Sequence, residues 1–250
     1  MDHALRILSL NLHKGFSSFN RRFVLHELRE AIRTANADLV FLQEVIGEHA
    51  GHARRHANWP PAPQYEFLAD TIWTSHAYGR NAVYQDGHHG NALLSHFPIE
   101  AYDNHDISVG RHERRGLLHC RIAVPWLTRP LHAICVHLGL REAHRRQQLG
   151  ALAALANRVA AAGEPLVVAG DFNDWRQRAH RRLATDARMT EAFIMCDGRA
   201  ARSFPVRWPL LSLDRIYLRG LRPRSTRVLT RRPWSHLSDH AALLCEVETC

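Results

Sequence analysis

The sequence predicts an α/β domain in which two β-sheets pack together and helices cover their outer faces. Short apolar runs typical of strands recur along all 250 residues, with only a few long helical segments between them. No linker-like stretch divides the chain, so we expect one domain over residues 1–250. Hydrophobic residues make up 46% of the chain, which is enough for a sizeable core.

The hydrophobic periodicity assigns the elements in chain order. The predicted strands are Leu5–Leu10, Asp38–Gln43, Asn91–Ser95, Leu117–Val124, Leu131–His137, Leu166–Ala169, Leu213–Leu218 and Ala241–Val247. The predicted helices are Phe23–Ala35 and Arg141–Ala162. We expect a loop at Gly47–Gln64, which is rich in His, Pro and Ala, and irregular structure at Arg199–Leu211.

The chain is basic, with a formal net charge of +9 and a pI near 10.0. This surplus favours a polyanionic partner, either nucleic acid or an anionic lipid surface. Lys14 is the only lysine, however, so the arginine bias can equally reflect the base composition of a genome.

Cysteine usage and the N-terminus bear on the compartment. The five cysteines are an odd number without a CxxC pair, which argues against a disulfide framework or a structural zinc site and for a reducing compartment. No apolar run is long enough to span a bilayer. The start of the chain, Met1 to Arg6, lacks the basic region and cleavage site of a signal peptide. We therefore expect a cytoplasmic protein without a transmembrane segment.

Polar side chains recur where the apolar runs stop. They are Asn11, Glu44, His137, Asp171 with Asn173, Asp214, and Asp239 with His240. Strand ends hold side chains at the rim of a rigid sheet, where several strands can direct them to one point. Carboxylate and amide oxygens suit Mg²⁺ or Mn²⁺, and histidines transfer protons near neutral pH. A solvated strand end or a turn explains each residue singly, but their joint occurrence predicts one metal-dependent site.

Seven short motifs extend this pattern from the first predicted strand to the last. They are Leu8-Ser9-Leu10-Asn11, Leu42-Gln43-Glu44-Val45, Gly90-Asn91-Ala92-Leu93-Leu94-Ser95, Val136-His137-Leu138, Gly170-Asp171-Phe172-Asn173, Leu213-Asp214-Arg215-Ile216 and Ser238-Asp239-His240. On these motifs the chain resembles the endonuclease/exonuclease/phosphatase superfamily, which includes DNase I-like nucleases and neutral sphingomyelinases. The resemblance implies a four-layer α/β sandwich of two packed mixed β-sheets flanked by helices, with the site at one end of the two facing sheets. It also implies divalent-metal-dependent hydrolysis of a phosphoester.

The resemblance further implies which residues bind the metal ion, expected to be Mg²⁺ or Mn²⁺. Glu44 would be the principal ligand, with Asn11 and Asp239 close by. Asp171 and Asn173 would align the attacking water and hold the phosphoryl oxygens or a second metal ion. The number of ions is left open.

The same resemblance assigns the proton-transfer roles. His240 would be the general base, oriented by Asp214, because a carboxylate can hold an imidazole in one tautomer. His137 would donate a hydrogen bond to the phosphoryl oxygen as negative charge builds in the transition state.

Four further residues are candidates for substrate contact: Arg80, His89, Asn91 and Arg141. Arg80 and His89 lie in predicted glycine-containing loops near the rim of the sheets, where either side chain can meet a phosphate, although a plain turn between strands is the alternative. Arg141 and Arg145 follow His137 into a helix and are one turn apart, so they reach the substrate or form a solvated helix face.

Several tryptophans and one arginine-rich segment can likewise have either a binding role or a purely structural role. Trp59, Trp73, Trp126 and Trp208 flank proline-containing loops, where they stack bases, enter a lipid interface or pack in the core. The stretch Arg219–Arg232 either follows a nucleic-acid backbone or is a solvated loop.

The motifs narrow the substrate without identifying it. Asn11-Leu12-His13-Lys14-Gly15 and Gln43-Glu44-Val45-Ile46 stand where the abasic-site repair nucleases usually carry Asn-Gly-Ile/Leu-Arg and Gln-Glu-Thr-Lys. The departure argues against base-excision repair. We expect a DNase I-like nuclease acting on DNA or RNA, with a phospholipid or small-molecule phosphodiesterase as the alternative. A non-catalytic binding module would have lost Glu44, Asp171 or His240, and all three are present.

Overall fold

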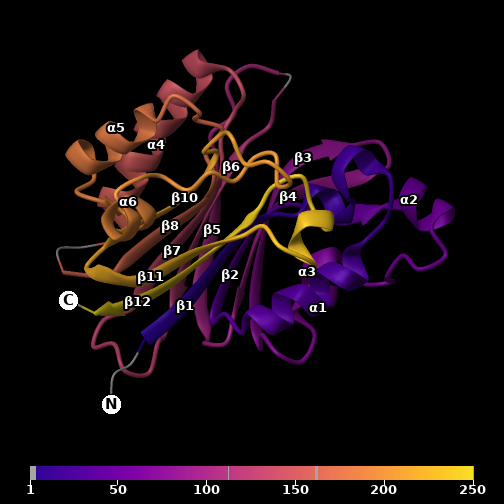
Figure 1. Ribbon diagram of the computed structural model, residues 1–250, viewed down its shortest axis with the longest axis horizontal. Helices are drawn as coiled ribbons and strands as arrows, with labels where there is room; N and C mark the ends of the chain where they lie inside the picture. The colour runs from indigo at the N-terminus through magenta and orange to yellow at the C-terminus, as the bar shows by residue number, and fades with distance from the viewer. Residues whose placement is uncertain (1–3, 112, 161–162, 250) are drawn as a thin grey trace.

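The computed structural model describes residues 4–111, 113–160 and 163–249. Two six-stranded sheets lie face to face in the middle of the molecule, and helices cover their outer faces (Figure 1). This arrangement confirms the predicted four-layer α/β sandwich. Some predictions concern residues outside the described part: Met1 to His3, the end of the long helix at Ala162, and Cys250. None of the helices within the described ranges combines the length and apolar character needed to cross a membrane.

The first sheet has the strand order β11-β12-β1-β2-β4-β3. Its strands are β1 (Ala4–Asn11), β2 (Leu39–His49), β3 (Ser75–Tyr84), β4 (Gly87–Ser95), β11 (Leu221–Leu229) and β12 (Ala242–Thr249). Only β1 and β2 are parallel, and α1 (Leu25–Ala35) lies between them in the sequence. The sheet is therefore mixed, as predicted.

The second sheet repeats this plan with the order β5-β6-β7-β8-β10-β9. Its strands are β5 (Ile99–Asp106), β6 (Gly116–Ile122), β7 (Leu131–His137), β8 (Leu166–Asp171), β9 (Thr190–Glu191) and β10 (Asp214–Arg219). Its parallel pair is β7 and β8, with α4 (Glu142–Val159) between them in the sequence. Each sheet thus has a central parallel pair whose strands end at the same edge, and Asn11, His137 and Asp171 close these strands.

The remaining helices are short. They are α2 (Ala50–Arg55), α3 (Gln64–Ala69), α5 (Arg178–Asp186), α6 (Ala192–Asp197) and the 3₁₀ turns η1 (His13–Gly15), η2 (Ser18–Asn20) and η3 (Trp234–His236). The loop predicted at Gly47–Gln64 was partly wrong, because it contains the end of β2 and all of α2. The irregular stretch at Arg199–Leu211 was confirmed, apart from an isolated bridge between Phe204 and Leu211.

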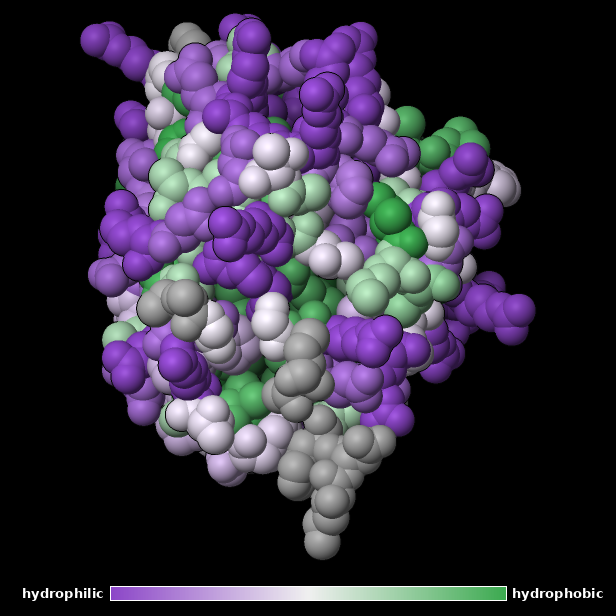
Figure 2. Space-filling model, turned by 90° about the vertical axis from the view of Figure 1, so that its left-hand side faces the viewer, coloured by the Kyte–Doolittle hydropathy of each residue, from purple (hydrophilic) through white to green (hydrophobic). Residues whose placement is uncertain are grey.

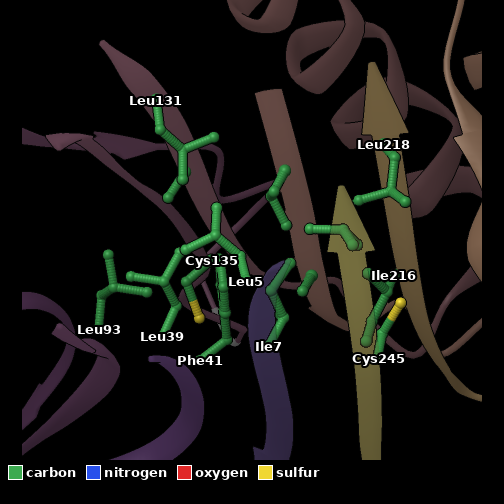
Figure 3. Packing of buried hydrophobic residues seen from close by; sticks show 14 of the residues in the cluster. Leu5, Ile7, Leu39, Phe41, Leu93, Leu131, Cys135, Ile216, Leu218 and Cys245 are labelled. Atoms are coloured by element: carbon green, nitrogen blue, oxygen red, sulfur yellow. The ribbon is translucent and has the colours of Figure 1, made fainter. Parts of the chain in front are cut away.

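Three apolar clusters hold the four layers together. The central one lies between the sheets, where Leu39 and Phe41 of the first sheet face Leu131 and Cys135 of the second (Figure 3). Two outer clusters bury the inner sides of α1 and α3 on one sheet and of α4 and α5 on the other. Because the central cluster joins the sheets along their length, the strand ends are held rigidly at its edge.

Candidate active site

Most of the strand-end residues meet in a cleft of about 320 Å³ at one edge of the two sheets, whereas Asp214 and Asp239 are not part of its lining. Both sheets contribute to its lining, which comprises Asn11, Glu44, Arg115, His137, Leu140, Asp171, Asn173, Trp175, Phe204, Leu211, Leu213 and His240. Clefts that combine apolar walls with a few convergent polar groups are typical of binding and catalytic sites.

The Asp171 carboxylate is the centre of this cleft. Its Oδ2 accepts a hydrogen bond from Asn11 Nδ2 at 3.2 Å and lies 3.5 Å from His137 Nε2 and 3.9 Å from His240 Nε2. Its Oδ1 accepts the backbone N–H of Asn173 at 2.8 Å. Burial raises the pKa of this carboxyl group, the positive charge of His240 lowers it, and Asp214 raises it again.

Gly170 explains how Asp171 reaches this position. The residue has φ +146°, and an added Cβ would lie 2.0 Å from the carbonyl oxygen of Val136 on the neighbouring strand. Only glycine allows the parallel strands β7 and β8 to approach so closely at their ends. The register then places His137 directly beside Asp171.

His240 is held between two carboxylates. Its Nδ1 forms a 2.9 Å hydrogen bond with Asp214 Oδ2, and both side chains are buried. Burial lowers the pKa of His240, but the charges of Asp214 and Asp171 outweigh burial and raise it to about 10. The ring therefore carries a proton at neutral pH in the cation-free protein, and its Nε2 is directed toward Asp171.

The pKa of His137 is shifted in the opposite direction. It is buried, and burial together with the positive charge of Arg115 holds its pKa well below the ordinary value. A neutral imidazole beside Asp171 can donate one hydrogen bond and accept another.

Glu44 reaches the cleft from a bulge rather than from a strand end. The pairing of β2 with β4 shifts register between Leu42 and Val45, and Glu44 adopts a left-handed conformation with φ 55°. The expectation that the strand ends at Glu44 was therefore wrong. The bulge turns this half-buried side chain toward the cleft, where its Oε2 lies 3.9 Å from Lys14 Nζ.

Asp239 lies beside the cleft and not in its wall. It lines a neighbouring pocket and sits 3.9 Å from His13 Nδ1. Since His13 and Lys14 are consecutive residues of η1, both Asp239 and Glu44 lie next to the same turn at the end of β1.

The donor set fits a hard divalent cation. Asp171, Asp214 and His240 place ligand atoms within 4.8 Å of one another, a buried group that could bind a metal ion. The hydrogen bond between Asp214 and His240 already uses two of these atoms, however. Glu44 and Asn11 line the same cleft and offer further oxygens, although Asn11 Oδ1 also accepts the backbone N–H of His13 at 3.0 Å. Oxygen donors are the ligands that Mg²⁺ and Mn²⁺ prefer.

The residues predicted to contact the substrate lie at different places relative to the cleft. Arg80 and His89 lie in β3 and β4, so the loops predicted around them were wrong, and neither side chain lines the cleft. Asn91 is buried and donates to the carbonyls of Gly116 and Cys135, which ties the two sheets together beneath the site. Their contacts with substrate stay predictions.

Arg141 and Arg145 do not form a common helix face. Arg141 is the exposed N-cap residue of α4 and lines a pocket that shares Leu140 with the cleft. Arg145 is buried, donates to the carbonyl oxygens of Gly139 and Leu140, and lies 4.6 Å from the ring of Trp175.

Several cleft residues were not predicted from the sequence. Arg115 donates to the Leu138 carbonyl and pairs with Glu113 at 2.8 Å, and Trp175 and Phe204 form apolar walls. Arg115 immediately precedes β6 and Trp175 follows the Asp171-Phe172-Asn173 motif, so proximity to a motif was the available signal.

The fold agrees with the family to which the chain belongs. A family model described as Endonuclease/Exonuclease/phosphatase family matches residues 8–240, so the chain belongs to that family. Members of this family are in general phosphoester hydrolases that depend on divalent metal ions. The chain is 54% identical over 244 residues to the uncharacterized protein YbhP of Escherichia coli K12, covering 98% of this chain and 96% of that protein. YbhP of Shigella flexneri matches to the same extent.

Solved structures share the fold at low sequence identity. An endonuclease/exonuclease/phosphatase from Beutenbergia cavernae has a TM-score of 0.81 and 18% identity, with 98% of this chain and 72% of that chain covered. A Danio rerio TDP2 structure with a single-strand DNA product has a TM-score of 0.70 and 17% identity, with 99% of this chain and 100% of that chain covered.

Proposed function

We propose that the protein is a divalent-metal-dependent phosphodiesterase whose catalytic groups are His240, Asp214, Asp171 and His137. The observation that carries this proposal is the position of His240, whose Nδ1 is held by Asp214 while its Nε2 is directed toward Asp171 in an open cleft. Such an arrangement fixes the tautomer and the orientation of a histidine that transfers protons.

The hydrolysis adds one water molecule across a phosphorus–oxygen bond. His240 Nε2 takes a proton from the water, the hydroxyl oxygen bonds to phosphorus, and the bond to the leaving alkoxide breaks. That alkoxide takes a proton from solvent, which gives an alcohol and a phosphomonoester, and His240 returns the proton of the attacking water to solvent. Asn173 is held by its bond to the Leu138 carbonyl, and it would contact the phosphoryl oxygens together with His137.

Glu44, Asn11 and Asp239 would hold Mg²⁺ or Mn²⁺ beside this group. When bound, the cation supplies Lewis acidity at a phosphoryl oxygen and positive charge that lowers the pKa of His240. The lower pKa matters because a proton acceptor must be neutral at the working pH.

DNA, RNA and phospholipids all contain phosphodiesters that suit this chemistry. The net charge of +9 supports a polyanionic substrate, and the similarly folded TDP2 of Danio rerio was solved with a single-strand DNA product. These two observations favour a nuclease. The exposed side chains of Leu140 and Trp175 in the cleft wall favour the second candidate, a phospholipid phosphodiesterase.

Hydrolysis of the soluble diester bis(4-nitrophenyl) phosphate tests the proposal without assuming a natural substrate. We expect turnover with Mg²⁺ or Mn²⁺ and none in EDTA. His240→Ala should lower kcat by roughly a hundredfold to ten-thousandfold, as general-base loss typically does, with KM little changed.

His76→Ala is the matched control, because His76 is exposed on β3 and does not line the cleft. Turnover that survives complete chelation, or wild-type turnover in His240→Ala, would overturn the proposal.

A further inference from the structure

Exposed apolar side chains gather around the mouth of the cleft. Among the described residues, nine large hydrophobic side chains are exposed: Phe19, Val83, Tyr102, Leu140, Trp175, Met195, Trp208, Leu210 and Leu211. Leu140, Trp175 and Leu211 line the cleft itself, and Phe19 and Trp208 line the pocket beside it. Single exposed apolar residues are ordinary on protein surfaces, but a cluster around a functional cleft indicates an interaction site.

The pocket beside the cleft makes this surface continuous. It has a volume of about 500 Å³ and shares Phe204 with the cleft. Leu210 lies between Trp208 and Leu211 in the chain and is 68% exposed. We call Phe19, Leu140, Trp175, Trp208, Leu210 and Leu211 the apolar rim.

Arginines accompany the apolar rim on both sides of the cleft. Arg21, Arg22 and Arg207 line the pocket that contains Phe19, and Arg111 and Arg141 line the pocket that shares Leu140. Of these five, Arg22 pairs with Glu27 at 3.0 Å.

Several carboxylates in the same region form ion pairs with arginines of the protein. Glu113 pairs with Arg115, and Glu142 pairs with both Arg176 and Arg178. Asp171 and Asp214 are buried beside His240, and Glu44 and Asp239 are the proposed metal ligands. The rim thus presents apolar side chains together with a net positive charge.

The chemistry of the apolar rim favours lipid over nucleic acid. Three of its six members are leucines, and Leu140 and Leu210 are 60% and 68% exposed. A leucine has no π-face on which a base can stack, whereas it gains from entering the hydrocarbon boundary of a bilayer. Aromatic and aliphatic side chains flanked by arginines are the combination that binds an anionic interface.

The side of the molecule that carries α5 and α6 offers a contrast. It lies to the left in Figure 1 and is mostly hydrophilic, with hydrophobic residues in a central recess and in smaller patches elsewhere on this face (Figure 2). On α6, Met195 is 48% exposed and lines neither the cleft nor the pocket beside it.

We propose that the apolar rim docks the protein on an anionic phospholipid bilayer. The rim side chains enter the interface, the arginines contact headgroup phosphates, and the phosphodiester of a lipid headgroup is brought to the cleft. The delivery of substrate rests on the proposed phosphodiesterase activity, but the docking does not. Hydrolysis there would add water across one phosphodiester bond, which leaves a phosphomonoester and an alcohol.

Vesicle flotation with full-length His240→Ala protein tests the docking without turnover. We expect binding to vesicles of phosphatidylglycerol and phosphatidylcholine, little binding to phosphatidylcholine alone, and weaker binding as salt increases. Adding Trp208→Ser with Leu210→Ser should weaken binding at least about tenfold, because apolar area is lost from the interface. Adding Met195→Ser instead should change nothing. Far-UV circular dichroism verifies that each variant is folded.

A single-stranded 20-mer oligonucleotide provides the competing outcome. If bases stack on the aromatic side chains, Trp208→Leu should abolish oligonucleotide binding, and Leu210→Ser should leave vesicle binding unchanged. That pair of results, or equal binding to anionic and neutral vesicles, would overturn the lipid proposal.

Hydrolysis of the soluble diester separates the two proposals. A wild-type protein that cleaves the diester but does not bind anionic vesicles refutes the docking alone. A protein that binds the vesicles but cleaves no diester refutes the phosphodiesterase proposal and leaves the docking in place.

Discussion

At the scale of single residues, neighbouring charges and burial determine which groups of the site are protonated. Asp171, Asp214 and His240 are buried together, so each charge strongly affects the others. Burial opposes protonation of His240, but the two carboxylates reverse that effect and raise its pKa to about 10. At His137, burial lowers the pKa and the positive charge of Arg115 lowers it further, so this ring stays neutral. Two histidines a few ångströms from the same carboxylate therefore have different protonation states.

The pKa of His240 can be tested with Asp214→Asn. The substitution removes one of the two charges that stabilise the imidazolium, so the pKa should fall clearly below about 10. An NMR titration of the His240 ring protons in the metal-free protein measures it. Asp186→Asn, at the exposed end of α5, is the control. An unchanged His240 pKa in Asp214→Asn would contradict the assigned pair.

The same pair makes stability depend on pH. The pKa of His240 is raised from 6.5 to about 10 on folding, so its contribution is fully present below pH 6.5 and lost as pH rises through 10. Asp214→Asn should therefore lower the free energy of unfolding more at pH 6 than at pH 10. Urea titrations at the two pH values measure the difference, and an equal loss at both would refute the linkage.

Metal binding should depend on Glu44. We expect Glu44→Gln to weaken Mn²⁺ binding at least about tenfold, because a charged oxygen ligand becomes a neutral amide. Isothermal titration calorimetry measures the affinity. Glu48→Gln is a closely matched control, since Glu48 is exposed on the same strand and does not line the cleft. Equal affinities in the two variants would remove Glu44 from the metal site.

At the scale of whole elements, hydrophobic periodicity predicted the interior strands of the two sheets but not their edge strands. The four strands that were not predicted, β3, β5, β9 and β11, are the four edge strands of the two sheets. Edge strands carry polar and charged residues because one side faces solvent, and exposed residues make up most of β5. The arginine-rich stretch at 219–232 is largely β11 for the same reason. Interior strands are buried on both faces and form nearly continuous apolar runs, which is why they were found.

A side chain at position 170 should disrupt the close contact between β7 and β8 and so destabilise the fold. Gly170→Ala places a Cβ 2.0 Å from the Val136 carbonyl at a φ that disfavours alanine, so we expect a loss of at least about 2 kcal/mol in unfolding free energy. Gly150→Ala, within α4, would place its Cβ 2.9 Å from the end of the flexible Arg182 side chain, which can move, so we expect a clearly smaller loss there. Denaturant unfolding of both variants checks this, and a neutral Gly170→Ala would show that the strands can separate there.

On the scale of the whole molecule, the two sheets share one core. The central cluster draws residues from both sheets, and neither sheet buries that face by itself (Figure 3). Asn91 and Asn11 add hydrogen bonds that cross from the first sheet to the second. The two halves of the chain are therefore expected to be stable only together.

The single-domain prediction follows from this arrangement. We expect one cooperative unfolding transition, in which far-UV circular dichroism and tryptophan fluorescence change together in urea. Trp73 reports on the first sheet and its helices, while α4 and α5 provide much of the helical signal beside the second. Two separated transitions would indicate two domains.

The sequence by itself determined the fold class, the interior strands, the long helices and the set of candidate catalytic residues. Apolar runs end where buried strands end, and the motifs at those ends keep their order along the chain. Asn11 and Asp171 are 160 positions apart, yet both were assigned to one site.

Only the tertiary structure decided how these groups meet. The bulge at Glu44, the close approach at Gly170 and the burial of Arg145 depend on strands and loops that are distant in the sequence. Four of the six tryptophans illustrate the same limit: Trp73 is buried, Trp59 and Trp126 are half-buried, and Trp208 is exposed. Periodicity describes one element at a time, whereas the position of a side chain at a cleft depends on every element packed around it.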